Sequence, residues 1–182
     1  MPKFIVQGGR PLHGTVTVGG SKNAALPILA ATLLTDELCV IKNVPDIEDV
    51  HTMLAILRSL GSEAEFDRHT VRIQTRRIKK GLVADVLACK MRASVLLLGP
   101  LVARTGEARL PYPGGCVLGA RPIDTHAAAL AQLGVRQVKE RKDEISFKGR
   151  PRPAEIVLPE FSVTATENAI MAAARVQGTA VI

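Results

Sequence analysis

The loop PGGCVLGARP, residues 113–122, places a cysteine, Cys116, among glycines and prolines. Glycine permits backbone conformations that other residues avoid, so we expect an exposed, adaptable loop. A thiol with an ordinary pKa of about 8.5 is mostly protonated at pH 7; it can donate a proton or, once ionised, act as a nucleophile. Arg121 follows in the same loop and could lower that pKa or bind an anion. A surface turn with an incidental cysteine is the alternative.

The segment VGGSKNAALP, residues 18–27, resembles the start of a helix that binds an anion. Ser21 can cap the helix, and Lys22 and Asn23 occupy its first turn. Free backbone N–H groups beside a lysine favour a negatively charged ligand. Arg92 has the matching place in a second, similar segment. Charged residues that only solubilise a helix end are the alternative.

These candidates lie within a sequence that repeats itself. Segments 49–61 and 124–134 both open with Asp-x-His and close with Leu-Gly, which predicts helices with an aspartate N-cap and a glycine C-cap. A charged hairpin is expected after each, at 62–75 and 135–149. Nearly all-apolar helices are expected at 21–34, 91–104 and 166–175, and short strands at 37–41, 107–110 and 178–182.

Helices without a polar face belong inside a protein rather than on its surface, so we expect an α/β (α+β) fold whose apolar helices are buried. The repeating unit is helix, strand, helix, hairpin. We expect two full units, at about 21–90 and 91–150, and a truncated third at about 151–182. The chain should therefore end inside a domain.

Residues that the repeat duplicates are more easily explained by packing or capping than by catalysis. We therefore interpret His51, His126 and Asp49 as structural. Cys39 and Cys89 lie in apolar surroundings and are expected to be core thiols.

Composition excludes several classes of protein. Aromatic residues make up 3% of the chain, too few for a protein that stacks bases of single-stranded nucleic acid. The 24 basic and 17 acidic residues give a diffuse net charge of +7, which favours an anionic small-molecule site over a nucleic-acid track. Three scattered cysteines and four histidines show neither disulfide nor metal-ligand spacing. Without a signal peptide or a long apolar run, a cytoplasmic protein without membrane contact is expected.

Four motifs, SKNAALPIL, MRASVLLLGPLVAR, PGGCVLGARPIDTH and SVTATENAIMAA, occur in an order that resembles the UDP-N-acetylglucosamine enolpyruvyl transferases. The resemblance runs from about residue 3 to 182. The related shikimate-pathway enolpyruvyl transferases share the architecture but not the PGGC loop, and are a distant alternative.

The resemblance implies a fold of two domains, each an inside-out α/β barrel of three units. Residues 1–20 would belong with a second domain that this sequence does not contain. Residues 21–182 would form most of the domain that carries the cysteine loop, short of the end of its third unit. Its partner would be the missing C-terminal domain of the same protein.

The implied reaction transfers the enolpyruvyl group of phosphoenolpyruvate to the 3-hydroxyl of UDP-N-acetylglucosamine, the first committed step of bacterial peptidoglycan synthesis. It needs neither metal nor organic cofactor. Cys116 would be the proton donor, would form a covalent adduct with phosphoenolpyruvate, and would be alkylated by fosfomycin. Phosphoenolpyruvate would be bound by Lys22, Asn23 and Arg121. UDP-N-acetylglucosamine would be bound by Arg92, Arg121, Pro122, Ile123, Asp124, Thr125, Ser162 and Val163.

Two positions depart from the family pattern. Thr164 stands where many members have glycine, and Glu160 replaces what can be a basic residue, which affects the expected diphosphate contacts. The proposed general base of the family, an aspartate, would lie in the missing domain. This chain alone is therefore expected to be inactive, and an incomplete, non-catalytic UDP-sugar-binding module is the alternative function.

Overall fold

The structure is a computed structural model that describes residues 3–79, 85–89, 91–111, 123–138 and 144–182. The first unit contains helix α1 (Lys22–Ala31), a short 3₁₀ turn η1 (Thr32–Leu34), strand β1 (Cys39–Ile41), helix α2 (Glu48–Ser59) and the hairpin β2 (Glu63–Asp67) and β3 (Thr70–Gln74). Its strands form an antiparallel sheet in the order β1-β3-β2.

The second unit repeats this order. It contains a short helix α3 (Asp85–Ala88), the 3₁₀ helix η2 (Arg92–Leu97), helix α4 (Leu98–Thr105), strand β4 (Glu107–Pro111), helix α5 (Asp124–Gln132) and strands β5 (Arg136–Val138) and β6 (Glu144–Lys148). Its antiparallel sheet has the order β4-β6-β5, which is the same topology as in the first unit. The repeat in the sequence is thus a repeat in the fold.

The third segment contributes helix α6 (Val163–Ala173), which begins three residues before the expected start. The strand expected at 178–182 is reduced to one parallel bridge between Val181 and Glu155.

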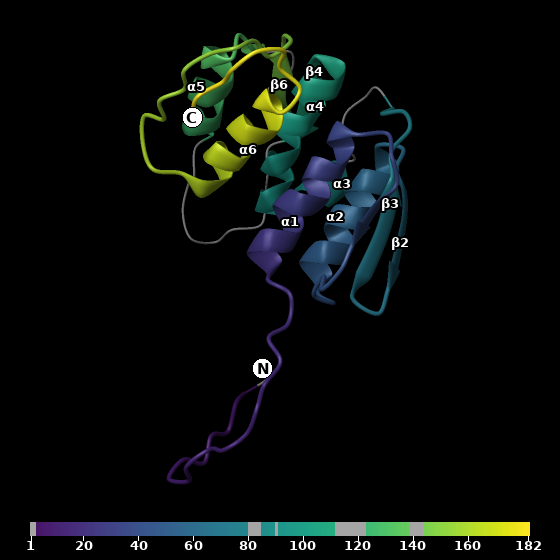
Figure 1. Ribbon diagram of the computed structural model, residues 1–182, viewed down its shortest axis with the longest axis vertical. Coiled ribbons are helices and arrows are strands. Elements are labelled where there is room, and N and C mark those ends of the chain that lie inside the picture. The colour runs from purple at the N-terminus through teal and green to yellow at the C-terminus, as the bar shows by residue number, and fades with distance from the viewer. Residues whose placement is uncertain (1–2, 80–84, 90, 112–122, 139–143) are drawn as a thin grey trace.

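The apolar helices form the interior, as expected. Figure 1 shows α1, α4 and α6 near the middle of the molecule, with the hairpin β2–β3 on one outer side. Helix α4 packs against α6, and α1 packs against α2 and η2. Fully buried aliphatic side chains fill the space between them, among them Leu29, Leu33, Leu54, Leu97 and Leu98. The core is aliphatic because the chain has few aromatic residues, and Phe147 is the largest fully buried side chain in the described part.

The ends of α2 and α5 differ by one or two residues from the expected bounds. Ile47 and Ile123 occupy the N-cap positions, so the prediction that Asp49 and Asp124 cap these helices is wrong. Both aspartates lie in the first turn instead, where a negative charge still interacts favourably with the helix dipole. The C-terminal prediction is confirmed for both helices, since Gly61 after α2 and Gly134 after α5 adopt φ values of 105° and 84°.

The helix expected at 91–104 is not continuous. It begins as the 3₁₀ helix η2 and becomes α-helical only at Leu98. Pro100 has no N–H to donate to the preceding turn, which weakens a regular helix at this point. A side chain of α6 supplies the second reason, described below.

The two cysteines predicted to lie in the core differ in their burial. Cys39 is half-buried, whereas Cys89 is exposed, so its prediction as a core thiol is wrong. The short α3 ends at the buried Ala88, which places Cys89 beyond its end and on the surface.

Residues 3–21 form no regular structure and extend away from the rest of the molecule (Figure 1). Within the described residues, no helix has both the length and the apolarity to cross a membrane.

Candidate functional site

Most of the site residues expected from the sequence lie at the starts of helices. Lys22 is the first residue of α1, and its Nζ lies 3.1 Å from Oδ2 of Asp49 in the first turn of α2. Both side chains are about half exposed, so the ion pair is weak and can exchange for another anion at small cost. Asn23 follows on α1 and is exposed. Ser21 occupies the N-cap position, but its side chain makes no capping hydrogen bond.

Three of the candidates belong to the cysteine loop, residues 113–122. Cys116, Arg121 and Pro122 lie outside the described residues. The description resumes at Ile123, the buried N-cap of α5, so the loop joins the start of this helix directly.

The remaining candidates lie on the second and third units. Arg92 is the first residue of η2 and is half-buried. Asp124 and Thr125 begin α5, where Asp124 is exposed and Thr125 is 4% exposed. Ser162 is the N-cap of α6, and its hydroxyl accepts a hydrogen bond from the backbone N–H of Ala165.

Side-chain hydrogen bonds connect the starts of α5 and α6. Thr125 Oγ1 donates to Oε1 of Glu160, in the segment that leads into α6, over 2.7 Å. Thr164 Oγ1, in the first turn of α6, lies 3.2 Å from Nε2 of His126. These two bonds join the start of α5 to residues on both sides of Ser162, the N-cap of α6. The segments expected to bind the nucleotide sugar, 123–125 and 162–163, are therefore held close together.

Behind these contacts lies a fully buried asparagine. Asn168 Oδ1 accepts the backbone N–H of Gly99 over 2.6 Å, and Nδ2 donates to the carbonyl of Val95 over 2.9 Å and to Nδ1 of His126 over 3.0 Å. In a regular α-helix the Gly99 N–H would donate to the Val95 carbonyl. The asparagine amide is thus inserted into the helix where η2 meets α4, and it satisfies both backbone groups.

Only glycine allows this insertion. A Cβ at position 99 would lie 2.4 Å from the backbone oxygen of Asn168, closer than two non-bonded atoms can approach. Gly99 therefore sets the separation of α4 and α6.

The same contacts define the state of His126. Its Nδ1 accepts a hydrogen bond, so in the neutral ring Nε2 carries the proton and donates to Thr164. Burial lowers the pKa of His126 to about 4, and the positive charge of Arg92 contributes to this. His126 is accordingly neutral at pH 7 and lies close enough to Arg92 to be influenced by its charge.

No role was predicted for Asn168, although its position in the sequence gives one indication of it. It lies in an otherwise apolar helix, and a buried amide must find hydrogen-bond partners. His126, interpreted from the repeat as a structural residue, is buried and hydrogen-bonded. Thr164 and Glu160, noted as departures from the family pattern, are the residues that link α6 to α5.

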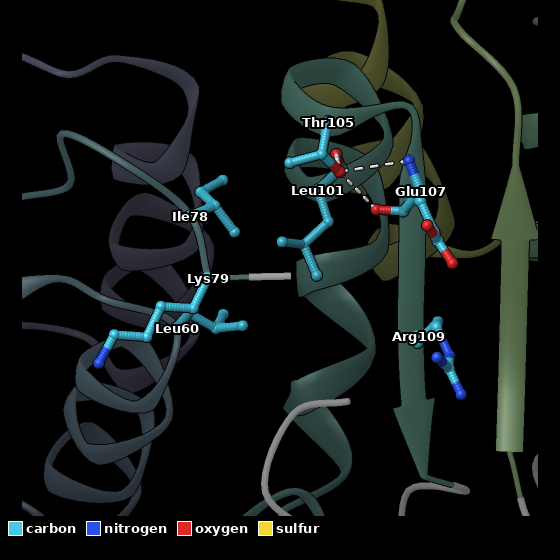
Figure 2. A pocket seen from close by; sticks show the side chains of 7 residues that line it. All are labelled: Leu60, Ile78, Lys79, Leu101, Thr105, Glu107 and Arg109. Carbon is cyan, nitrogen blue, oxygen red and sulfur yellow. Dashed lines mark hydrogen bonds between the residues drawn. The ribbon is translucent and has the colours of Figure 1, made fainter. Parts of the chain in front are cut away.

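A cavity of about 240 Å³ lies elsewhere, between the two units. Figure 2 shows its lining, which comes from the end of α2, the segment after β3, the C-terminal half of α4 and β4. The lining residues are Leu60, Ile78, Lys79, Leu101, Thr105, Glu107 and Arg109. The candidate site lies at the opposite, N-terminal end of η2–α4, so this cavity does not belong to it. Across residues 3–182, apart from the gaps given above, no group of three or more His, Cys, Asp or Glu side chains could hold a metal ion.

Comparisons with known proteins show the family of the chain. The family described as EPSP synthase (3-phosphoshikimate 1-carboxyvinyltransferase) matches residues 6–182. The UDP-N-acetylglucosamine 1-carboxyvinyltransferase of Treponema denticola is 47% identical over the whole chain, and that of Methylacidiphilum infernorum is 46% identical. UDP-N-acetylglucosamine 1-carboxyvinyltransferase 1 of Carboxydothermus hydrogenoformans is 49% identical. The chain spans only 43–44% of the length of these curated relatives.

Solved structures give the same fold. The enolpyruvyl transferase NikO from Streptomyces tendae matches 95% of this chain, and 41% of its own, with a TM-score of 0.77 and 22% identity. An EPSP synthase from Acinetobacter baumannii matches 91% of this chain, and 39% of its own, with a TM-score of 0.71 and 18% identity. The family match over nearly the whole chain and the shared fold lead to one conclusion: the chain belongs to the EPSP synthase family.

Proposed function

We propose that this chain is the part of a UDP-N-acetylglucosamine 1-carboxyvinyltransferase that carries the reactive thiol. One observation carries the proposal: relatives with this name are 44–49% identical along the whole chain. The complete enzyme would transfer the enolpyruvyl group of phosphoenolpyruvate to the 3-hydroxyl of UDP-N-acetylglucosamine.

The proposed reaction is an addition followed by an elimination. A proton is added to the methylene carbon of phosphoenolpyruvate, while the 3-hydroxyl oxygen of the sugar bonds to the adjacent carbon and loses its own proton. The tetrahedral intermediate then releases phosphate, and loss of a proton from the new methyl group restores the double bond. No cofactor enters this balance.

Cys116 is the proposed proton donor, since a thiol that is mostly protonated at pH 7 can protonate carbon. Lys22, Asn23 and Arg121 are proposed to bind phosphoenolpyruvate. The exposed position of Lys22 at the start of α1 supports this, because the helix N-terminus and the ammonium group both attract phosphate.

The nucleotide sugar is proposed to bind across the starts of η2, α5 and α6. Arg92 begins η2, and the hydrogen bonds between α5 and α6 hold two further helix N-termini near each other. Free N–H groups at these ends suit a diphosphate. The proposed contacts are Arg92, Arg121, Pro122, Ile123, Asp124, Thr125, Ser162 and Val163.

The cellular setting is proposed on the same basis. The enzyme would commit UDP-N-acetylglucosamine to peptidoglycan synthesis in the cytoplasm, and a further domain of the same protein would complete its active site. That domain would correspond to the part of the relatives that this chain does not match.

The test is phosphate release by the full-length protein. With phosphoenolpyruvate and UDP-N-acetylglucosamine we expect continuous release, and with 3-phosphoshikimate as acceptor we expect background. Release only with 3-phosphoshikimate would instead indicate an EPSP synthase.

The role of the thiol is tested separately. Cys116→Ala should abolish turnover, and intact-mass spectrometry should show a fosfomycin adduct on the wild type but not on this variant. Cys89→Ala is the matched control, because Cys89 is an exposed thiol that should be neither required nor modified. An adduct on Cys89, or an active Cys116→Ala protein, would contradict the proposal.

A further inference from the structure

Two side-chain pairs join segments that are 35 or more residues apart in the sequence, and both pairs lie at the proposed nucleotide-sugar site. Thr125 bonds to Glu160, and His126 bonds to Thr164. Thr125 and His126 are consecutive on α5, whereas Glu160 and Thr164 stand on either side of Ser162, the N-cap of α6. Two bonds on opposite sides of one cap restrict both the separation and the rotation of the two helix starts.

The inner pair has a rigid support. His126 is 3% exposed, and its Nδ1 accepts from the fully buried Asn168. Because Asn168 also bonds to Val95 and Gly99, its amide is fixed in one orientation. The Nε2 proton of His126 is therefore aimed at Thr164.

The outer pair is of a different kind. Thr125 is buried, whereas Glu160 is exposed, so the buried hydroxyl holds a carboxylate at the surface. A hydrogen bond to an ionised acceptor is stronger than one between neutral groups. The bond fixes where this negative charge lies, which matters beside a site proposed for a diphosphate.

We propose that Thr125–Glu160 and His126–Thr164 form a strap of positioning residues that sets the geometry of the nucleotide-sugar site. This inference rests on the proposed function. The strap residues act by holding the N-termini of α5 and α6 in register, so that the backbone N–H groups of both helices face one ligand. Its loss should weaken binding of UDP-N-acetylglucosamine and leave phosphoenolpyruvate binding unchanged.

The structure offers conservative variants for the test. Thr125→Val and Thr164→Val keep the shape of the side chain and remove the hydroxyl, whereas Thr164→Ser keeps the hydroxyl. Glu160→Gln retains an oxygen that can accept from Thr125. Thr166→Val is the matched control, because the Thr166 hydroxyl bonds to the carbonyl of Ser162 within α6 and crosses to no other segment.

The experiment measures the dissociation constant of UDP-N-acetylglucosamine by calorimetry and the KM of both substrates, using the full-length protein. Each valine variant of the strap should raise the dissociation constant about three- to tenfold, the range expected for one lost hydrogen bond. Thr164→Ser and the Thr166→Val control should stay within about twofold of the wild type. Glu160→Gln keeps the acceptor and removes a negative charge beside the proposed diphosphate site, so it should bind the nucleotide sugar at least as tightly as the wild type. Melting temperatures identify any variant that has simply lost stability.

The outcomes separate the two proposals. If the wild type binds UDP-N-acetylglucosamine and the valine variants bind equally well, the strap has no positioning role. The same conclusion follows if Thr166→Val weakens binding as much as Thr164→Val. If the wild type itself does not bind the nucleotide sugar, the proposed function fails, and the strap has no such ligand to position.

Discussion

His126 shows how one buried side chain can make stability depend on pH. It is neutral in the fold because burial, and then the charge of Arg92, lower its pKa to about 4, from 6.5 in an unperturbed histidine. Above pH 6.5 the ring is neutral in both the folded and the unfolded chain, so the shift has no effect. Between pH 6.5 and about 4 only the unfolded chain gains this proton, and stability falls as the pH falls.

We therefore expect His126→Gln to remove a pH-dependent contribution to the free energy of unfolding. One proton corresponds to about 1.4 kcal/mol per pH unit, so the stability advantage of the wild type over this variant should shrink by about 2 kcal/mol between pH 7 and pH 5. Urea denaturation at the two pH values measures this. His13→Gln, in the exposed N-terminal segment, is the control and should follow the wild type at both pH values.

Among single residues, sequence reasoning found those that define helix starts but not those that connect them. Lys22 and Arg92 were located from the repeat and Ser162 from the family resemblance. They lie at the starts of α1, η2 and α6, Ser162 as the N-cap. Asn168 was missed because its partners come from α4 and α5. A contact across 69 residues leaves no periodic pattern in a single sequence.

At the scale of elements, the junction of η2 and α4 depends on a close approach to α6. The missing Cβ of Gly99 lets the α6 backbone come near, and Asn168 then replaces a hydrogen bond of the helix. Helix boundaries such as Ile47 and Ile123 were predicted to within one or two residues, because capping depends on local sequence. The break in α4 was not predicted, because it depends on another helix.

Gly99→Ala should separate α4 from α6. The new methyl group would overlap the Asn168 backbone, so we expect a loss of about 3 kcal/mol or more, within the range of severe core overpacking. Thermal denaturation followed by circular dichroism checks this. Gly8→Ala is the control, since a Cβ there meets nothing within 4 Å and stability should not change. Equal melting curves for both variants would refute the close approach.

A second element-scale contact joins the two units through an arginine. Arg104, in the last turn of α4, donates to four carbonyl oxygens of the first unit, those of Leu33, Thr35, Thr75 and Arg76. These carbonyls follow α1 and β3, so one guanidinium group connects two separate ends of the first unit with the second. Desolvation lowers the pKa of Arg104, but an arginine remains charged at neutral pH.

Arg104→Met should therefore destabilise the protein by about 2–4 kcal/mol, because several carbonyls lose a charged donor. Arg104→Lys should recover only part of this, since an ammonium group cannot reach four carbonyls in a planar fork. Guanidinium denaturation gives the free energies of unfolding. Arg72→Met, on the exposed side of β3, is the control and should lie within about 0.5 kcal/mol of the wild type.

At the scale of the whole molecule, the repeat was the most informative feature of the sequence. It predicted two copies of a strand and a hairpin, and apolar helices at the centre. The structure has two sheets of the same strand order, with α1, α4 and α6 near its middle. The cysteine loop occurs in one copy only, so the repeat offers no counterpart from which to predict its conformation.

The N-terminal segment carries the last prediction. Its Val16 and Val18 alternate with threonines, a pattern typical of a strand with one buried face, yet they are 87% and 85% exposed. Phe4 and Leu12 are exposed as well. The relatives are more than twice as long as this chain, and residues 1–20 are expected to pack against a second domain.

Val18→Lys should therefore have different effects in two forms of the protein. In the 182-residue chain the side chain is already exposed, so the melting temperature should not change. In the full-length protein the same charge would lie in an apolar interface, with a loss of about 2 kcal/mol or more. Amide hydrogen exchange should likewise show residues 15–19 protected only in the full-length form. Equal exchange in both forms would place the segment outside any interface, because a strand that pairs with nothing cannot protect its N–H groups.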